Sequence, residues 1–263
     1  MWDRALLKKN AKQAFRRNYW TCVAVSAVAM MLTGGLSFGS GGGNSNSSEV
    51  SLQTNQNYSF DSLMAIIEQV PDYVWTIIWA SLLVGTVIGL CIALFVSNVV
   101  QIGCNRYFLE NREHKTEFGQ LFYGFQGGRY SSNVWVMFLR TLYIWGWSLL
   151  FLIPGIVKAY SYMLVPYILA ENSNLDRRRV FELSREMMRG YKWKAFVLEL
   201  SFFGWNLLSA FTYGILNIFY VNPYMYATYA EFYSALKAEA KMRGILQPGE
   251  LPDRLIVEEQ ADA

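Results

Sequence analysis

Three charged residues lie inside otherwise apolar blocks of the sequence, and they are the first candidates for a functional role. They are Arg140, Lys158 and Glu199. If these blocks cross a bilayer, a charge near the centre costs about 2.5–3.5 kcal/mol even on a lenient insertion scale. Such a charge therefore finds an opposite charge or extends to the nearer membrane surface.

Arg140 and Glu199 are the candidates for an intramembrane ion pair. An internal repeat described below places Arg140 beside Leu198, one residue before Glu199, so both would lie at similar depth on equivalent helices. Alternatively, each side chain extends to the inner surface, because each begins only a few residues from it. Lys158 lies closer to the opposite surface and is expected to extend outward.

The sequence contains no recognisable catalytic or metal-binding motif. G-x-S-x-G, the phosphate-binding loop, the dinucleotide fingerprint and H-E-x-x-H are all missing from the printed sequence. The single histidine, His114, lies in the charged segment LENREHKTEF with no Cys or second His beside it. We therefore expect no catalytic residue, no metal and no cofactor, and the chain is not predicted to be an enzyme.

The apolar blocks themselves indicate a membrane protein. Hydrophobic residues make up 53% of the chain and charged residues only 16%, against about 25% charged residues in soluble domains. A membrane span needs about 20 apolar residues and must be helical, because its backbone has no water to bond. The candidate spans are about 19–36, 74–102, 134–153, 156–170, 195–211 and 215–233.

The sequence therefore predicts an all-α, polytopic transmembrane helical bundle of about six spans, arranged as three hairpins with interfacial amphipathic helices. A soluble α-helical protein is the alternative. The short fourth span leaves a further alternative, in which the hairpin at 154–155 is re-entrant and does not fully cross the bilayer.

The distribution of Lys and Arg predicts the orientation. They gather before the first span, after the second, after the fourth and in the tail, whereas the loop 37–72 contains neither. Because cytoplasmic loops are enriched in Lys and Arg, both termini are expected in the cytoplasm of a multi-pass plasma-membrane protein. Residues 1–246 would form a single transmembrane domain with a flexible outer loop at 37–72, and residues 247–263 a disordered cytoplasmic tail.

The spans repeat. Aligning Trp135 with Trp193 matches two Gly-Trp-x-Leu-Leu runs, and a one-residue gap places Pro166 on Pro223. A weaker third copy begins near Trp20. Proline inside a helix removes a hydrogen bond, so Pro166 and Pro223, with the neighbouring Asn222, are candidates for helix breaks beside a cavity.

Two segments that precede a span are amphipathic and basic. One face of the first carries Leu7, Ala11, Ala14 and Phe15, and one face of the second carries Val180, Leu183, Met187 and Tyr191. Helices of this kind lie along an anionic leaflet. The second segment also contains a basic inner-surface patch, which consists of Arg177, Arg178, Arg179, Arg185 and Arg189.

The run 153–233 closely resembles a bacterial integral-membrane family catalogued as domain of unknown function 975. The segments LLKKNAKQAFRRNYW and QIGCNRYFLENR also look like that family, so the resemblance covers most of residues 1–240. The family looks distantly similar to the membrane portion of some glycerophosphodiester phosphodiesterases. The resemblance implies a polytopic membrane protein, typical of Gram-positive bacteria, with no established activity and no catalytic residues to carry over. The Gly/Ser/Asn-rich outer loop departs from it.

The leading functional prediction is a non-catalytic membrane scaffold or accessory protein. Its partners would be the bilayer, with anionic lipids at the inner face, and a membrane protein or a second copy of the chain; nucleic acid is not expected. The alternative is a small transporter or exporter subunit with a polar cavity in the bundle. A lipid-acting enzyme ranks third, because only Glu171, Glu231 and scattered loop residues could serve it.

Overall fold

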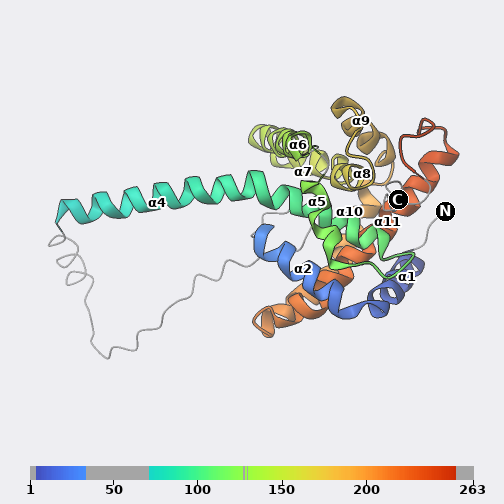
Figure 1. The fold of residues 1–263 in the computed structure, drawn as a ribbon, viewed down its shortest axis with the longest axis horizontal. Helices are drawn as coiled ribbons and strands as arrows, with labels where there is room; N and C mark the ends of the chain where they lie inside the picture. Colours follow the sequence, from blue (N-terminus) through green and yellow to red (C-terminus); the bar gives the residue numbers. More distant parts are fainter. Residues whose placement is uncertain (1–3, 34–70, 127, 129, 253–263) are drawn as a thin grey trace, which may run out of the picture.

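The computed structural model describes residues 4–33, 71–126, 128 and 130–252, and within them the chain forms only helices and the turns between them (Figure 1). The all-α prediction is confirmed for this part of the chain. The predicted outer loop, from 37 to 70, and the end of the predicted tail, from 253, lie outside the described residues.

The helices follow the predicted apolar blocks. The first half of the chain contains α1 (Arg4–Arg17), α2 (Tyr19–Thr33), α4 (Asp72–Ile92), the π-helical η1 (Ala93–Ser97), α5 (Asn98–Glu110) and the 3-10 helix η2 (Phe118–Phe125). The second half contains α6 (Tyr130–Leu150), α7 (Leu152–Ser161), α8 (Val165–Glu171), α9 (Arg177–Met187), α10 (Lys192–Phe211), the π-helical η3 (Asn217–Val221) and α11 (Asn222–Met242).

Two helical segments are long and apolar enough to cross a membrane. They are Tyr73–Glu110, which comprises nearly all of α4, η1 and α5, and Ile153–Glu171, which comprises α7 and α8. The apolar helix Tyr19–Leu32 is shorter. Helices of membrane-spanning length and composition are therefore present, while the prediction of about six crossings stays a prediction.

Helices that follow each other in the predicted hairpins also pack together. Helix α2 contacts η1 and α5, α6 contacts α7, and α10 contacts η3. The core lies where α5, α8 and α11 meet, with α1 packed along α11. Its largest enclosed side chains include Tyr107, Phe108 and Tyr233. Tyr233 stacks on Tyr167 of α8, and Phe108 stacks on Tyr226 of α11.

Helix α4 differs from the other long helices because no other described helix packs along it; we call it the bare helix. Figure 1 shows it extending away from the body of the molecule, opposite the end that carries α1 and α9. Its described side chains are almost all exposed, including Trp79 at 67% and Leu83 at 66%. The rest of the continuous helix, α5, is enclosed by α2, α8 and α11. The apolar surface of α4 therefore has no partner within the described residues.

The two amphipathic segments fold as predicted but bury their apolar faces in protein. In α1 the buried residues are Leu7, Ala11, Ala14 and Phe15, and the predicted face of the second segment is buried in and after α9. Helix α1 packs on α11, and α9 packs on α8 and α11. The protein core therefore covers these apolar faces, and the prediction that the two helices lie along an anionic leaflet stays a prediction.

The predicted disordered tail begins too early. Residues 245–252 fold back onto the helices, and Leu251 is only 8% exposed and part of the hydrophobic core. Glu250 is also buried. Composition suggested disorder because this segment is rich in Pro, Gly and Glu. The Glu250 carboxylate nevertheless pairs with Arg179 of α9, and Lys237 of α11 donates to the carbonyl of Pro252.

One close approach inside the core depends on glycine. A Cβ atom at Gly103 in α5 would lie 1.8 Å from the carbonyl oxygen of Leu121 in η2, well inside van der Waals contact. At Gly85, on the bare α4, an added Cβ would meet nothing within 4 Å. The same continuous helix therefore contains one glycine that packing requires and one that it does not.

We predict that Gly103→Ala lowers the free energy of unfolding by about 1–3 kcal/mol, the usual cost of overpacking. Gly85→Ala serves as the matched control, and helix propensity predicts that it stabilises by up to about 1 kcal/mol. Thermal unfolding of both purified variants measures the difference. Equal effects at the two positions would show that η2 does not pack on α5 in this way.

Candidate functional site

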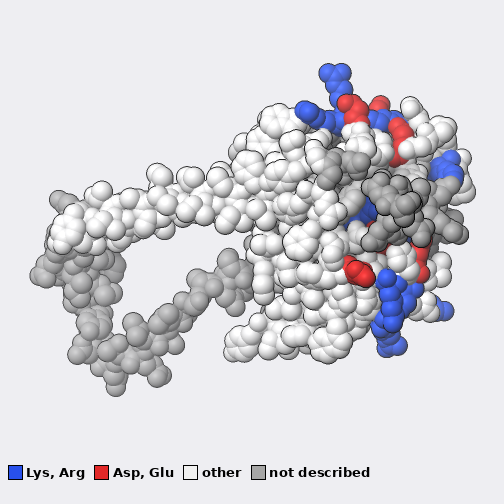
Figure 2. Space-filling view, in the orientation of Figure 1, with Lys and Arg blue, Asp and Glu red and all other residues white. Residues whose placement is uncertain are grey.

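Charge is concentrated at one end of the molecule. On the face drawn in Figure 2, the described Lys, Arg, Asp and Glu side chains gather at the end opposite α4, while the rest of the described surface on this face carries none. The sequence explains the separation, because residues 73–105 of α4, η1 and α5 and residues 19–33 of α2 include no charged residue.

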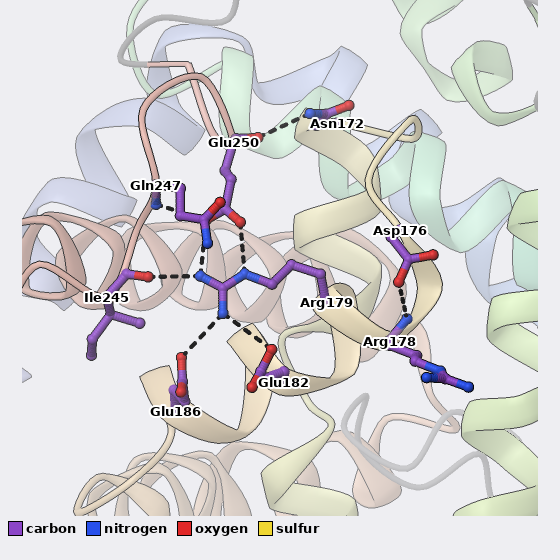
Figure 3. A network of polar contacts seen from close by, with 9 residues as sticks. All are labelled: Asn172, Asp176, Arg178, Arg179, Glu182, Glu186, Ile245, Gln247 and Glu250. Atoms are coloured by element: carbon purple, nitrogen blue, oxygen red, sulfur yellow. Dashed lines mark hydrogen bonds and ion pairs between the residues drawn. The ribbon is translucent and has the colours of Figure 1, made fainter.

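Arg179 of α9 is the centre of a polar network (Figure 3). Its Nε and Nη2 atoms donate to the two carboxylate oxygens of Glu250 at 2.6 and 3.1 Å. Nη2 also donates to the carbonyl of Ile245 at 2.8 Å. Its Nη1 atom lies 3.2 Å from Glu182 and 3.6 Å from Glu186. Paired planar contacts of this kind are among the stronger hydrogen bonds in proteins.

This network corrects the predicted basic patch. Arg179 faces inward to residues 245–250 and is not available to a lipid surface, whereas Arg177, Arg178, Arg185 and Arg189 are exposed. Helix α9 starts at a side-chain cap, in which the amide of Arg178 donates to Asp176 at 3.1 Å. The cap and the Arg179 network together fix the backbone of α9, which carries three of the four exposed arginines.

Buried ion pairs join the helices beneath this network. Arg106 and Glu110 of α5 pair at 2.6 Å, and Arg106 also donates to the carbonyl of Ala170 in α8 at 2.9 Å. Lys237 of α11 lies 2.7 Å from Glu171 of α8. Removing one partner of a buried pair leaves the other charge uncompensated, at a cost of about 3–5 kcal/mol. These pairs therefore fix how α5, α8 and α11 meet.

A cavity of about 640 Å³ lies beside these pairs. Its charged walls come from the end of α5, the end of α8 and from α11, and residues 246–252 close one side. The charged lining residues are Arg112, Glu113, Glu171, Lys237 and Lys241. At least three of them are already engaged, since Arg112 pairs with Glu231 at 2.9 Å and Lys237 pairs with Glu171 at 2.7 Å.

The cavity offers charge and hydrogen bonds without an evident reacting group. Within the described residues no three His, Cys, Asp or Glu side chains lie close enough to hold a metal. His114 lies exposed after α5. The arrangement suits recognition of a charged group or segment, and the prediction that the chain is not an enzyme stays a prediction.

The predicted pair of Arg140 and Glu199 does not form. Arg140 Nε of α6 donates to the backbone carbonyl of Tyr162 at 3.0 Å. Glu199 of α10 accepts from the hydroxyl of Tyr160 at 2.5 Å. Helix α7 contacts both α6 and α10 and supplies these partners. The repeat predicted equal depth for the two charges, but equal depth on equivalent helices does not make those helices neighbours.

Both predicted helix-breaking prolines lie in the first turn of a helix. Pro166 opens α8 after the turn that ends α7, and Pro223 opens α11 after the π-helical η3. Asn222 donates from Nδ2 to the sulfur of Met30 at 3.0 Å, while its enclosed Oδ1 has no hydrogen-bond partner. These three residues are buried, and the 640 Å³ cavity lies elsewhere, at the charged end.

Sequence reasoning missed the residues that build the charged junction. The pair of Arg106 and Glu110 could have been found, because oppositely charged residues four apart meet on one helix face. Lys237 and Glu250 pair with residues 66 and 71 positions away. A single sequence gives no signal for such long-range pairs.

Residues 149–240 match the model of a family described as a protein of unknown function (DUF975). No curated protein and no solved structure matches the chain. The family match supports the resemblance over α7, α8, α9, α10, η3 and most of α11. The distant likeness to phosphodiesterase membrane portions stays a prediction.

We predict that Glu250→Gln lowers stability and removes part of its dependence on acid pH. The hydrogen bond from Arg179 holds the pKa of Glu250 below its usual value. Because the folded pKa is lower than the unfolded one, this stabilisation is complete above about pH 4.5 and is lost as pH falls through the folded pKa. Unfolding measured from about pH 3 to about pH 7 tests this, because ordinary carboxylates titrate near about pH 4.

Glu182→Gln is the matched control, because Glu182 also contacts Arg179 but its side chain is 50% exposed. Exposed pairs contribute about 0–1 kcal/mol, so this variant should unfold nearly as the parent does. If the two variants behaved alike at every pH, Glu250 would not anchor residues 245–252.

Proposed function

We propose that this chain is a multi-pass protein of the plasma membrane that binds anionic lipid or a protein partner through its charged end, without catalysing a reaction. The observation that carries the proposal is the separation in Figure 2 between the charged end and the uncharged remainder. An aqueous protein has no need for such a separation, whereas a protein that crosses a bilayer requires it.

The bare helix α4 supports the membrane part of the proposal. It contains 21 residues and is continuous with η1 and α5. Apolar area exposed to water costs about 25 cal/mol per Å², and monomeric soluble proteins rarely expose patches above a few hundred Å². Lipid removes this cost, because acyl chains cover an isolated apolar helix as well as protein does.

We further propose six crossings in three hairpins, with both chain ends in the cytoplasm. The helix contacts support this arrangement, since α2 packs on η1 and α5, α6 on α7, and α10 on η3. The basic residues of α1, α9 and the end of α11 would then all face the cytoplasm, as the excess of cations on that side requires.

Four exposed arginines, three in α9 and one in the turn that follows it, form the proposed binding face. Each basic residue near an anionic leaflet contributes about 1 kcal/mol of attraction. The cap and the Arg179 network fix the backbone of α9, which carries three of these arginines. They are Arg177, Arg178, Arg185 and Arg189.

Native mass spectrometry of the purified chain tests the binding role. The parent should retain an anionic lipid or a defined protein partner, and the double variant Arg177→Gln, Arg178→Gln should weaken that binding at least about tenfold, given the loss of two such contacts. A parent chain that retains neither lipid nor partner contradicts the proposed role.

A transporter or exporter subunit is the second candidate. It is favoured by Asn217 and Asn222, whose enclosed Oδ1 atoms have no hydrogen-bond partner beside η3. Single π-helical turns often occur at functional sites. Solute flux into vesicles that contain only this chain, without a retained lipid or partner, would favour this candidate.

We predict that Leu83→Arg in α4 reduces the fraction of protein inserted into the membrane. A central arginine costs about 2.5–3.5 kcal/mol on the insertion scale. Leu6→Arg in α1 is the matched control, since Leu6 is also exposed, at 55%, but lies on the basic helix α1. Alkaline extraction of membranes should release the first variant and not the second.

A parent chain that is fully released by alkaline extraction rejects the membrane assignment itself. Equal insertion of both variants would instead place α4 in water or against another protein.

A further inference from the structure

Arg140 is a buried cation for which the described structure provides no carboxylate. It is 9% exposed. The other cations at buried junctions have such partners: Arg106 has Glu110, Arg112 has Glu231 and Lys237 has Glu171. A buried guanidinium without a counter-charge is costly. The lack of a carboxylate beside Arg140 therefore requires an explanation.

Only part of the Arg140 side chain is used. Its Nε donates to the carbonyl of Tyr162 at the end of α7, which is one of five N–H groups that a guanidinium carries. The terminal nitrogens form no other hydrogen bond or ion pair within the described residues. They are also not among the fully enclosed polar atoms without a partner. They are therefore not completely sealed from solvent, although the residue as a whole is buried.

Further cations surround the same turn of α7. Lys158 Nζ lies 5.9 Å from the ring centre of Tyr162 and 4.8 Å from that of Trp147. Arg185 of α9 lies one turn after Phe181, whose ring packs on that of Tyr162 with ring centres 5.3 Å apart. Neither Lys158 nor Arg185 forms an ion pair with a carboxylate in the part of the chain that the structure describes.

Lys192, at the start of α10, adds to this positive potential. Burial lowers the pKa of Lys192, and repulsion from Lys158 lowers it further. Glu199 of α10 accepts from the hydroxyl of Tyr160 and forms no ion pair with these cations within the described residues. The junction of α6, α7 and α9 thus gathers cations that have no ion-pair partner in the part of the chain that the structure describes.

Aromatic rings form the apolar side of the site. Tyr143 of α6, Tyr162 of α7 and Phe181 of α9 pack on one another, with ring centres 5.3–6.1 Å apart. Tyr143 is itself 45% exposed. Tyrosine and tryptophan favour the boundary between headgroups and acyl chains. The site therefore combines cations with the ring types that are found at headgroup depth.

We propose that Arg140, assisted by Lys158 and Arg185, binds a phosphate group at the junction of α6, α7 and α9. Free terminal nitrogens of a guanidinium can bind two phosphate oxygens at once, and the phosphate would supply the missing counter-charge. The phosphate can belong to an anionic phospholipid headgroup or be free in solution. This inference rests on the proposed function, because it names the ligand class of a membrane protein that binds anionic lipid. The site shares only Arg185 with the four arginines of the binding face.

The test uses the full chain in detergent and two probes. Native mass spectrometry measures retention of added phosphatidylglycerol, and thermal unfolding measures stabilisation by inorganic phosphate. Arg140→Gln should weaken binding of the effective probe at least about tenfold, which corresponds to about 1.4 kcal/mol. Arg16→Gln, which removes an exposed charge from α1, should leave that binding unchanged.

The two probes identify the source of the phosphate. Retained lipid that millimolar phosphate does not displace indicates a headgroup site, whereas stabilisation by phosphate without lipid indicates a soluble ligand. Unchanged binding of both probes by Arg140→Gln overturns the inference. If the double variant Arg177→Gln, Arg178→Gln then loses the lipid, the proposed function survives without this site.

A second variant keeps the test decisive if Arg140→Gln fails to fold. Lys158→Gln removes a partly exposed cation that makes no hydrogen bond or ion pair with the described residues. It should still weaken phosphate or lipid binding several-fold. Unaltered binding in this variant, together with the folding defect of Arg140→Gln, would assign Arg140 to supporting the end of α7 alone.

Discussion

The ion pair between Lys237 and Glu171 holds together the part of the molecule on which the rest depends. It joins α11 to the end of α8 at 2.7 Å, and Lys237 also donates to the carbonyl of Pro252 at 2.5 Å. Tyr233, one turn earlier on α11, donates to the same carboxylate at 3.0 Å. One buried carboxylate thereby connects two helices, while its cationic partner also holds the folded end of the chain. Because such groups are costly when unpaired, the arrangement tolerates little displacement.

The local pattern of the sequence predicted much of the fold. The periodicity of α1 identified its four buried residues, since an apolar face repeated every three to four positions must meet an apolar surface. It could not reveal whether that surface is lipid or protein, and here it is protein. The uncharged blocks predicted the positions of the helices. The two prolines marked places where helical hydrogen bonding is interrupted, because proline lacks a backbone N–H group.

Contacts between distant residues account for what could not be predicted. Arg179 was assigned to a basic surface because its neighbours in sequence are arginines, yet its ligands lie at 245 and 250. Arg140 and Glu199 were paired on the basis of a repeat, yet α7 lies against both helices and supplies a partner to each. A repeat relates positions within copies, whereas ion pairing depends on which copies touch. The cavity is equally non-local, because residues 246–252 complete it only after the chain folds back.

The continuous helix from Asp72 to Glu110 has a mechanical consequence. Its first part, α4, is bare, and its last part, α5, is clamped among α2, α8 and α11. No loop interrupts it to absorb motion, although η1 has the wider hydrogen-bonding pattern of a π-helix. A bilayer that thickens or thins changes the preferred tilt of a bare apolar rod. If α4 crosses a bilayer as proposed, the torque of that tilt would reach Arg106 and its bond to α8, and the helix would couple bilayer thickness to the geometry of the charged junction.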